Sequence, residues 1–217
     1  MSAQNSLDLQ LEQGLDLLGV AVPTQARVAL LTYLELLARW SVSFNLTAIR
    51  QPEQMVTRHL LDSLAILPWI EGKTLADLGS GAGLPGIPLA IARPSLSISL
   101  LESNGKKARF LRMVRRELGL SQLEIVEDRI QNWQGQYDCI TTRALGRLDE
   151  MLVWGGHLLA PAGRWLAMKG KAAEIDSLQD IAPFYIHGVH RLQVPNLDAE
   201  RHLVVIKKTA PTGNPTI

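Results

Sequence analysis

Apolar side chains recur with a helical period in the part of the chain that precedes residue 71. Apolar residues three and four positions apart form one face of a helix, because an α-helix turns once in about 3.6 residues. Gly19 ends the first of these patterns, and Pro52 suits the first turn of the third. The pattern predicts helices over Leu7–Leu18, Pro23–Trp40 and Pro52–Leu67.

The pattern changes at Thr74 to short apolar runs that alternate with helical segments. Strands are predicted over Thr74–Leu78, Ser97–Leu101, Leu123–Val126, Tyr137–Thr141 and Arg164–Met168, the last after a turn at residues 161–163. Helices are predicted over Ile87–Ala92, Lys106–Leu118 and Asp149–Leu159. Repeated strand–helix units favour an α/β fold with a doubly wound, mostly parallel sheet and helices on both faces.

The final part of the chain has a different pattern. His187–Val194 and His202–Lys208 indicate two strands joined by a short loop, which predicts a terminal antiparallel hairpin. We therefore expect residues 1–70 to form a helical extension packed on a core of residues 71–208. Residues 209–217 contain two prolines and a glycine, and we expect them to be a disordered tail.

A dense cluster of glycines follows the first predicted strand, between Asp77 and Gly86. Glycine tolerates a positive φ and lets a ligand approach the backbone where a Cβ would collide with it. The loop leads into a helix N-terminus, whose free N–H groups favour negative charge. This strand–loop–helix unit predicts a site for a nucleotide-like ligand, since a plain structural turn does not require so many glycines.

Two cofactors compete for this loop. Gly81, Gly83 and Gly86 match G-x-G-x-x-G, the dinucleotide fingerprint, which is weak evidence by itself. Asp77, Gly79, Gly81 and Gly83 also match acid-x-Gly-x-Gly-x-Gly, which is typical of class I methyltransferases that use S-adenosylmethionine (SAM). A carboxylate at the strand tip repels a pyrophosphate but attracts the cationic groups of SAM. The terminal hairpin also favours SAM, because a dinucleotide-binding half would continue with strand–helix units.

The ends of the other strands supply further cofactor contacts, because ligands of open α/β sheets lie beyond the carboxyl ends of the strands. Glu102 ends the second predicted strand. It follows the glycines by about 20 residues, the spacing of a carboxylate that accepts hydrogen bonds from ribose hydroxyls in SAM or NAD alike. After the third strand, Asp128 and Ile130 are expected beside an adenine.

The fourth strand and the loop after it bear on the methyl acceptor. They lack the Asn/Asp-Pro-Pro-aromatic motif of enzymes that methylate exocyclic adenine nitrogens, and Cys139 lies inside a strand, where a small core residue is the ordinary interpretation. Without a nucleophile or a general base, an acceptor with a free lone pair fits, such as guanine N7, and catalysis would consist of positioning in a polarised site. Arg143 either holds the acceptor or SAM, or forms a structural ion pair.

One predicted helix concentrates cations in a chain whose formal net charge is only +1. Its basic residues are Lys106, Lys107, Arg109, Arg112, Arg115 and Arg116, and no acid follows them before Glu117. Phosphate contacts supply most nucleic-acid affinity, so this stripe is a candidate for RNA binding that Lys169 would extend. A solvated helix face is the alternative interpretation.

The composition excludes several other classes of protein. Of 217 residues, 47% are hydrophobic and 20% charged, which suits one globular domain with an attached extension. One cysteine excludes an internal disulfide, and the five histidines show no zinc-ligand spacing, so we expect no metal site. We see no apolar signal core and no apolar run long enough for a membrane span, so we expect a cytoplasmic protein with no membrane partner, and a monomer.

Motifs from about Leu30 to Lys208 resemble the bacterial RsmG family, also called glucose-inhibited division protein B. The segments that carry the resemblance are Asn45–Thr47, Arg58–Ser63, Asp77–Leu89, Lys106–Leu111, Thr142–Ala144, Lys169–Gly170 and Arg201–Ile206. The Leu84–Pro88 extension of the glycine loop is much more particular than the general methyltransferase pattern.

The resemblance implies a SAM-dependent methyltransferase that acts on N7 of a guanine in 16S ribosomal RNA, in the decoding region of the small ribosomal subunit. The N7 lone pair would attack the sulfonium methyl directly, without a covalent intermediate, and S-adenosylhomocysteine would be the product. The expected cofactor-binding residues are Asp77, Gly79, Ser80, Gly81, Gly83, Leu84, Glu102, Asp128, Ile130, Gln131 and Arg143. Among these, the resemblance matches Gly79, Leu84, Ile130, Gln131 and Arg143 to SAM-contacting positions of the family. The expected RNA-binding residues are Asn45, Arg58, His59, Lys106, Arg109, Arg112, Arg116 and Lys169.

Other functions stay open on the sequence alone. A SAM-dependent methyltransferase of a small molecule or a protein would use the same glycine loop. An NAD-binding regulatory module would bind NAD and not SAM. An RNA-binding protein without catalysis would bind a cofactor and RNA but transfer no methyl group. The form of the acceptor, naked RNA or ribosomal particle, also stays open.

Overall fold

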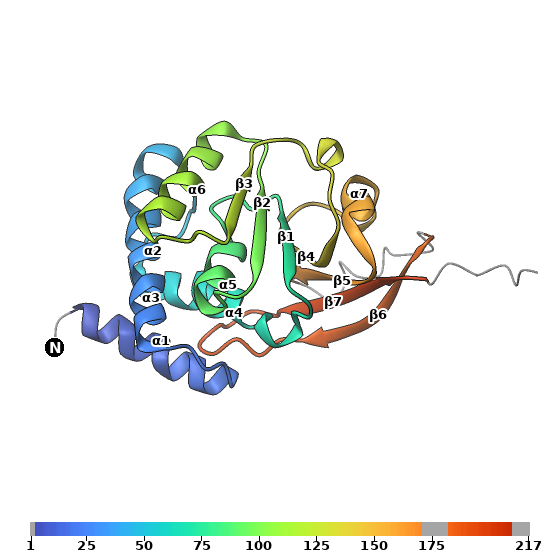
Figure 1. Ribbon diagram of the computed structural model, residues 1–217. Coiled ribbons are helices and arrows are strands. Elements are labelled where there is room, and N and C mark those ends of the chain that lie inside the picture. Colours follow the sequence, from blue (N-terminus) through green and yellow to red (C-terminus); the bar gives the residue numbers. More distant parts are fainter. Residues whose placement is uncertain (1–2, 171–181, 210–217) are drawn as a thin grey trace, which may run out of the picture.

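The computed structural model describes residues 3–170 and 182–209, and its strands form one twisted sheet in the order β3-β2-β1-β4-β5-β7-β6 (Figure 1). The strands are β1 (Thr74–Leu78), β2 (Ser97–Leu101), β3 (Leu123–Val126), β4 (Tyr137–Arg143), β5 (Leu159–Lys169), β6 (Phe184–Arg191) and β7 (His202–Lys208). The first five are parallel, and β7 is antiparallel to both of its neighbours, β5 and β6. The predicted parallel sheet with a terminal hairpin is therefore confirmed.

Helices cover both faces of the sheet (Figure 1). One face carries α1 (Ala3–Leu18), α2 (Thr24–Phe44), α5 (Gly86–Ala92) and α6 (Gly105–Glu117), and the other carries α7 (Leu148–Gly155). Two clusters of buried apolar side chains fill the two layers. Because both faces are covered, the central strands are buried along almost their whole length, as in β1, where only the first residue is not fully buried.

The third predicted helix is broken into short pieces. It consists of α3 (Pro52–Met55), the π-helix η1 (Val56–Leu61), α4 (Asp62–Leu64) and, further on, the 3₁₀-helix η2 (Leu67–Trp69). A π-turn adds one residue to the helical repeat and is often found at functional sites. The apolar period of the sequence does not separate this widened turn from an ordinary α-helix, so the break was not predicted.

The start of β5 differs from the predicted turn at residues 161–163. The strand begins at Leu159 and runs through this segment, while α7 ends at Gly155 and a 3₁₀-turn, η4 (Gly156–Leu158), follows it. The pairing of β4 with β5 shifts register between Tyr137 and Cys139. A Cβ at Gly163 would lie 3.0 Å from the carbonyl oxygens of Tyr137 and Asp138, so the glycine permits an irregular strand pair at this point.

The helices of residues 3–70 share one apolar cluster with the sheet. Leu11, Leu37 and Leu61 belong to the same buried cluster as Leu75 and Leu100. The hydroxyl of Tyr33 on α2 donates a hydrogen bond of 2.8 Å to the carbonyl oxygen of Ala82 in the glycine loop. The domain boundary near residue 70 stays a prediction, and residues 210–217 of the predicted tail lie outside the described residues.

No helix within residues 3–170 and 182–209 is both long enough and apolar enough to cross a membrane.

Candidate functional site

A cavity of about 610 Å³ lies at the edge of the sheet where β1, β2 and β4 end. This is the edge at which ligands bind in open α/β sheets. Its wall consists of Leu46, Thr47, His59, Gly79, Ser80, Gly81, Ala82, Leu84, Leu101, Glu102, Ser103, Lys107, Asp128, Arg129, Ile130, Gln131, Arg143, Ala144, Leu145 and Trp154. Most of the predicted cofactor-binding residues are brought together here from four separate segments of the chain.

The glycine loop leaves open space at Gly81. This residue has a φ of +58°, and a Cβ built on it would meet no atom nearer than 3.9 Å. A side chain there would project into free volume beside the loop, so glycine keeps that volume available to a ligand. At Gly79 and Gly83, in contrast, a Cβ would collide with Leu145 and Ile87 respectively, so packing also requires glycine at these two positions.

Glu102 joins the loop to the end of β2. Its two carboxylate oxygens accept hydrogen bonds from the backbone N–H groups of Gly81, at 2.9 Å, and Asn104, at 2.8 Å. Each oxygen keeps a further lone pair, and the residue lines the cavity. A carboxylate held in this way is suited to accept hydrogen bonds from the ribose hydroxyls of a nucleoside, as the sequence predicts.

Asp77 lies behind the loop rather than in the wall of the cavity. Its side chain is fully buried, and its Oδ2 accepts a hydrogen bond of 2.9 Å from the N–H of Gly86. Burial raises the pKa of the Asp77 carboxyl to about 7, although the Gly86 N–H and the charge of Arg143 act in the opposite direction. The predicted cofactor contact of Asp77 is thus replaced in this conformation by support of the loop, and Gly83 likewise lies outside the wall.

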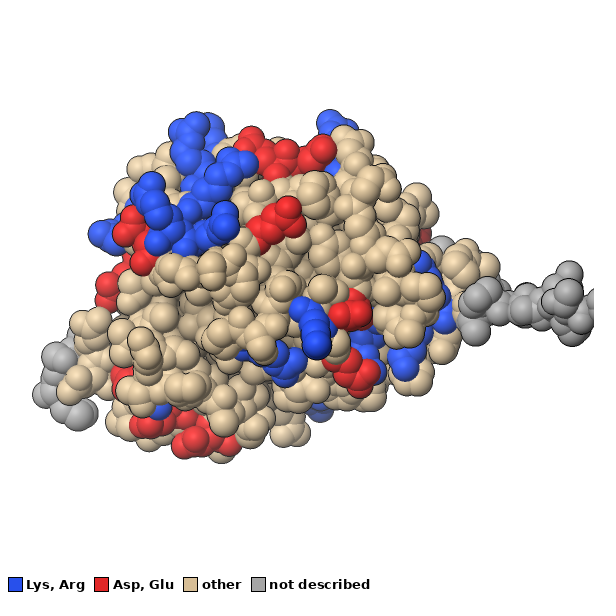
Figure 2. All heavy atoms as spheres, in the orientation of Figure 1, with Lys and Arg blue, Asp and Glu red and all other residues tan. Residues whose placement is uncertain are grey.

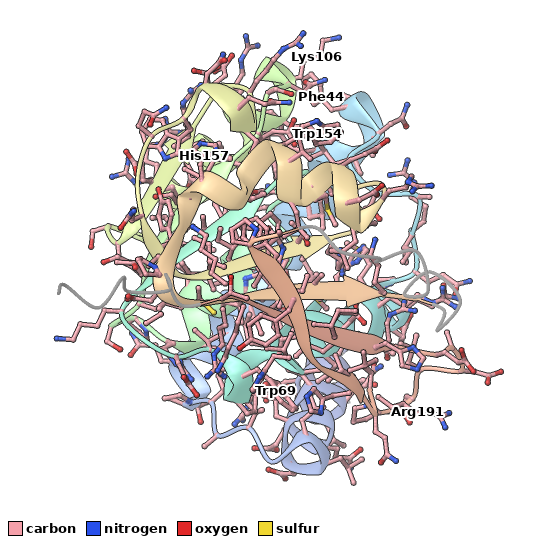
Figure 3. All side chains as sticks on the ribbon, turned by 90° about the vertical axis from the view of Figure 1, so that its right-hand side faces the viewer. Phe44, Trp69, Lys106, Trp154, His157 and Arg191 are labelled. Atoms are coloured by element: carbon pink, nitrogen blue, oxygen red, sulfur yellow. The ribbon has the colours of Figure 1, made fainter. Side chains whose placement is uncertain are left out.

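The segment after β3 forms another part of the wall of the cavity. Asp128, Ile130 and Gln131 line the cavity, and their contact with a cofactor stays a prediction. The 3₁₀-helix η3 (Ile130–Asn132) is held by a hydrogen bond from the Asn132 side chain to Asp128. Sequence reasoning missed Trp154. It is a half-buried aromatic residue of α7, next to Gly155 of the buried stripe, and Figure 3 shows it at the same end of the molecule as Lys106.

A second cavity, of about 560 Å³, adjoins the first, because His59, Arg143 and Ala144 line both. The remaining residues of its wall are Ile49, Arg58, Asp62, Gly146, Met168, Lys169, Gly170 and Arg201. Four of the eleven lining residues are arginine or lysine, and the only acid among them is Asp62. The second cavity is therefore suited to a polar acceptor that carries negative charge, such as a nucleotide in a chain.

Asp62 organises the arginines of the second cavity. It is 2% exposed, and its carboxylate accepts hydrogen bonds from Arg143, at 3.0 Å, and from Arg201, at 2.7 Å. The ion pair expected of Arg143 as one alternative is present, and the residue also lines both cavities, where a contact with SAM or the acceptor stays a prediction. The Arg201 contact was not predicted, since the two partners are 139 positions apart.

His59 occupies the wall between the two cavities. Its Nε2 lies 2.9 Å from the hydroxyl of Thr47. Burial, together with the positive charge of Arg143, lowers the pKa of His59 to about 4, so the ring is neutral at neutral pH. This histidine can orient a partner by a hydrogen bond, but it is not a cation that would attract phosphate.

Cys139 does not serve as a nucleophile in this geometry. It is buried inside β4, and burial raises the pKa of its thiol to about 12. The interpretation as a small core residue agrees with this placement. Within the described part of the chain, no group of His, Cys, Asp and Glu side chains is arranged to hold a metal ion.

The predicted RNA-binding residues divide into two groups. Arg58, His59 and Lys169 line the second cavity, whereas Lys106, Arg109, Arg112 and Arg116 are exposed along α6. Figure 2 shows Lys and Arg atoms gathered over α6. Two of the α6 cations have acidic partners, since Arg112 pairs with Glu127 at 2.7 Å and Arg116 with Glu117 at 3.1 Å. Asn45 follows the end of α2 in a left-handed conformation and lines neither cavity.

Solved structures share the fold. The chain is similar to TrmN from Thermus thermophilus, with a TM-score of 0.55 and 15% identity over 71% of this chain and 53% of that chain. It is also similar to magnesium protoporphyrin IX methyltransferase (ChlM) from Synechocystis PCC 6803 with bound SAM, with a TM-score of 0.57 and 15% identity over 72% and 83% of the two chains. The strand order and these neighbours show the class I SAM-dependent methyltransferase fold.

Sequence comparison is more specific. The family model GidB, described as rRNA small subunit methyltransferase G, matches residues 27–204. A protein named ribosomal RNA small subunit methyltransferase G from Xylella fastidiosa (strain M23) is 52% identical over 91% of this chain and 93% of its own length. One of the same name from Xanthomonas euvesicatoria pv. vesicatoria (strain 85-10) is 53% identical over 82% of this chain and 85% of its own. The chain therefore belongs to the rRNA small subunit methyltransferase G family.

Proposed function

We propose that this protein is a SAM-dependent methyltransferase that methylates N7 of a guanine in the 16S RNA of the small ribosomal subunit. The two adjoining cavities that meet at Arg143 and His59 are the observation that carries the proposal. One cavity has the glycine loop and the ribose-binding carboxylate that a nucleoside cofactor needs. The other has the cations that an RNA acceptor needs.

The residues of the first cavity fit SAM. The free volume beside Gly81, the carboxylate of Glu102 and the segment around Ile130 would hold its amino acid, ribose and adenine parts respectively. When bound, SAM supplies an electrophilic methyl group on a positively charged sulfur. The antiparallel strands that end the sheet favour SAM over the dinucleotide alternative, because a dinucleotide-binding half would continue with strand–helix units.

The residues of the second cavity would position the acceptor. Arg58, Arg143 and Arg201 present guanidinium groups that can bind phosphate or the O6 edge of a guanine, and Asp62 fixes two of them. Guanine N7 carries a lone pair and no proton, so the chain needs no general base. The neutral ring of His59 and the buried thiol of Cys139 agree with catalysis by positioning and electrostatics.

The decisive experiment is methyl transfer from radiolabelled SAM to small ribosomal subunits and to naked 16S RNA, both from cells that lack this protein. Chemical cleavage at N7-methylguanine then locates the label. We expect label at a single guanine, and the better of the two substrates identifies the natural acceptor. Label in ribosomal protein, or label in RNA that resists this cleavage, would overturn the proposed acceptor and favour a protein or another base.

A matched pair of variants tests the second cavity. Arg58 lines it, whereas Arg50 is an exposed arginine outside both cavities. We expect Arg58→Gln to raise the KM for the RNA substrate at least tenfold without changing SAM affinity, and Arg50→Gln to change neither. Equal effects of the two substitutions would remove the second cavity from RNA recognition.

The basic face of α6 is proposed as a phosphate-binding surface next to the cofactor cavity, to which Lys107 contributes. Arg109 and Arg115 are its sharpest test, because both are exposed and neither forms an ion pair within the described residues. Neutralising both to Gln should reduce the slope of log affinity against log salt by about 1.4, the effect of two lost phosphate contacts on a single strand. An unchanged slope would identify α6 as a merely solvated face.

A cytoplasmic location and a monomeric state complete the proposal.

A further inference from the structure

A groove of about 480 Å³ runs between α2 and α6, outside the two cavities described above. Trp40 and Phe44 line it, and their rings stack with centroids 5.1 Å apart at an angle of 27°. Both rings are half-buried. Beneath them the buried ring of Phe110 contacts Trp40 with a centroid distance of 5.6 Å, so the aromatic pair rests on a rigid base.

The unpaired charge in the lining of this groove is a cation. Arg39 lines it, is exposed, and has no ion pair among the residues that the structure describes. The α6 side of the groove consists of Met113 and Glu117, which directly follow the exposed arginines Arg112 and Arg116 of the basic face. Glu117 is paired with Arg116. An aromatic platform beside cations is the arrangement that binds single-stranded nucleic acid, with bases on the rings and phosphates on the cations.

The groove continues into the functional site along one connector. Phe44 lines the groove, Leu46 and Thr47 line the first cavity, and Ile49 lines the second. Figure 3 shows Phe44 and Lys106 at the same end of the molecule as Trp154, which lines the first cavity. Phe44 and Ile49 are separated by five peptide units, a span of at most about 18 Å, so a strand held in the second cavity can reach the groove within a few nucleotides.

We propose that this groove binds an unpaired nucleotide of the RNA substrate, a few positions from the methylated guanine, with its base on Phe44 and its phosphate at Arg39. The inference rests on the proposed function and adds a second recognition point to it. The unpaired cation of Arg39, the arginines next to the groove on α6 and the continuity with the second cavity favour RNA over a protein partner. The groove would thereby help to select where on the RNA the methyl group is placed.

The test uses the full-length protein and small ribosomal subunits from cells that lack it. In Phe44→Leu the ring is lost but an apolar side chain remains, and in Phe44→Tyr the ring is kept. Arg39→Gln provides an independent, exposed variant that leaves the aromatic pair intact. Subunit binding is measured directly by filter retention, methyl transfer is measured as KM and kcat, and SAM affinity is measured by calorimetry.

We expect Phe44→Leu and Arg39→Gln each to weaken subunit binding and to raise KM about tenfold, with kcat and SAM affinity unchanged, and Phe44→Tyr to behave as the wild type. Unaltered subunit binding and KM in both Phe44→Leu and Arg39→Gln would overturn the inference. Methyl transfer by the wild type would still uphold the proposed function in that case. If instead the wild type transfers no methyl group to the subunit, the proposed function fails, and the direct binding measurement still decides whether the groove holds RNA. Equal losses in Phe44→Leu and Phe44→Tyr would also overturn the inference, because they would indicate a packing role.

Discussion

Gly81 and Gly119 occupy the same left-handed region of backbone space, with φ values of +58° and +62°. A side chain at either position would meet no close neighbour in the protein. They differ in place, because Gly81 lines the first cavity and Gly119 follows the end of α6. A side chain at Gly119 would therefore bring backbone strain alone, whereas a side chain at Gly81 would bring the same strain and also occupy space in the cavity.

We predict that Gly81→Val lowers SAM affinity at least about 100-fold, because the new side chain fills the volume that the ligand would occupy. Gly119→Val carries a similar strain, about 1–2 kcal/mol, but should leave SAM affinity unchanged. Calorimetric titration with SAM, alongside thermal unfolding of both variants, checks the prediction. Tight SAM binding by folded Gly81→Val would show that the ligand lies elsewhere.

Asp77 and Asp138 illustrate opposite effects of folding on a carboxyl group. Burial raises the pKa of Asp77 to about 7. The pKa of Asp138 is lowered, because its carboxylate accepts hydrogen bonds from the Lys73 N–H and from the N–H and hydroxyl of Thr74. The first group favours the folded state while it is protonated, and the second favours it while it is ionised.

The contribution of Asp77 to the free energy of unfolding is therefore present below pH 4 and is lost as the pH rises to 7. The loss is about 3–4 kcal/mol, from a raised pKa of some three units. Asp77→Asn, which keeps an acceptor for the Gly86 N–H, should flatten this part of the stability profile. Asp138→Asn should instead remove stability that the wild type gains as the pH rises from the lowered pKa to the ordinary aspartate pKa, and keeps at higher pH. Urea unfolding from about pH 2 to about pH 8 measures both profiles. Parallel profiles for the wild type and Asp77→Asn would contradict the assignment.

At the scale of elements, Asp62 joins three segments that are far apart in the chain. It begins α4, Arg143 ends β4, and Arg201 immediately precedes β7. The guanidinium side chains are 20% and 23% exposed, whereas the carboxylate is almost completely buried. Removal of one charge from such a buried cluster strongly destabilises the folded state, because the remaining charged groups lose their partner where little water can solvate them.

Asp62→Asn should therefore lower the free energy of unfolding by about 1–3 kcal/mol and reduce methyl transfer, since Arg143 and Arg201 lose their common anchor. Asp149→Asn is the matched control, because its partner Arg147 is highly exposed. The control should change the free energy of unfolding by less than about 1 kcal/mol. Denaturation midpoints of the two variants decide the matter, and similar values would mean that the buried triad contributes little.

The sequence predicted where helices and strands occur better than it predicted irregularities within them. The strands β1, β2 and β3 have the predicted bounds, because alternation of apolar runs with glycine and proline is a local signal. The π-helix η1 and the early start of β5 were missed. Both features depend on contacts with segments that are distant in the chain. The helix η1 packs against α1, and β5 pairs with β4 through the register shift that Gly163 permits.

At the scale of the whole molecule, the helices of residues 3–70 and the sheet form one packed structure. Leu30, Leu60 and Ile66 are completely buried in the cluster that also contains Leu89 of α5. Removal of residues 1–70 would expose the face of this cluster that α2 and η1 now cover. Apolar area of this kind supplies most of the stability of a domain.

We predict that a chain that begins at residue 71 does not unfold cooperatively and binds hydrophobic dyes, as compact states without fixed packing do. The full-length protein should show one cooperative transition under the same conditions. Calorimetry and dye binding of both chains check this. A sharp transition in the shortened chain would establish an independent domain and confirm the boundary near residue 70.

The sequence by itself determined the fold class, the glycine loop, the carboxylate at the end of the second strand and the basic face of α6. These features depend on backbone preferences and on apolar periods that act over a few residues, so they can be read along the chain. The tertiary structure alone decided that Asp77 lies behind the loop and that Trp154 lines the cavity. It also brought Asp62 to Arg143 and Arg201, across 81 and 139 positions of the chain. The physical reason is that burial, pKa and charge pairing depend on which distant segments pack together, and no local pattern specifies that.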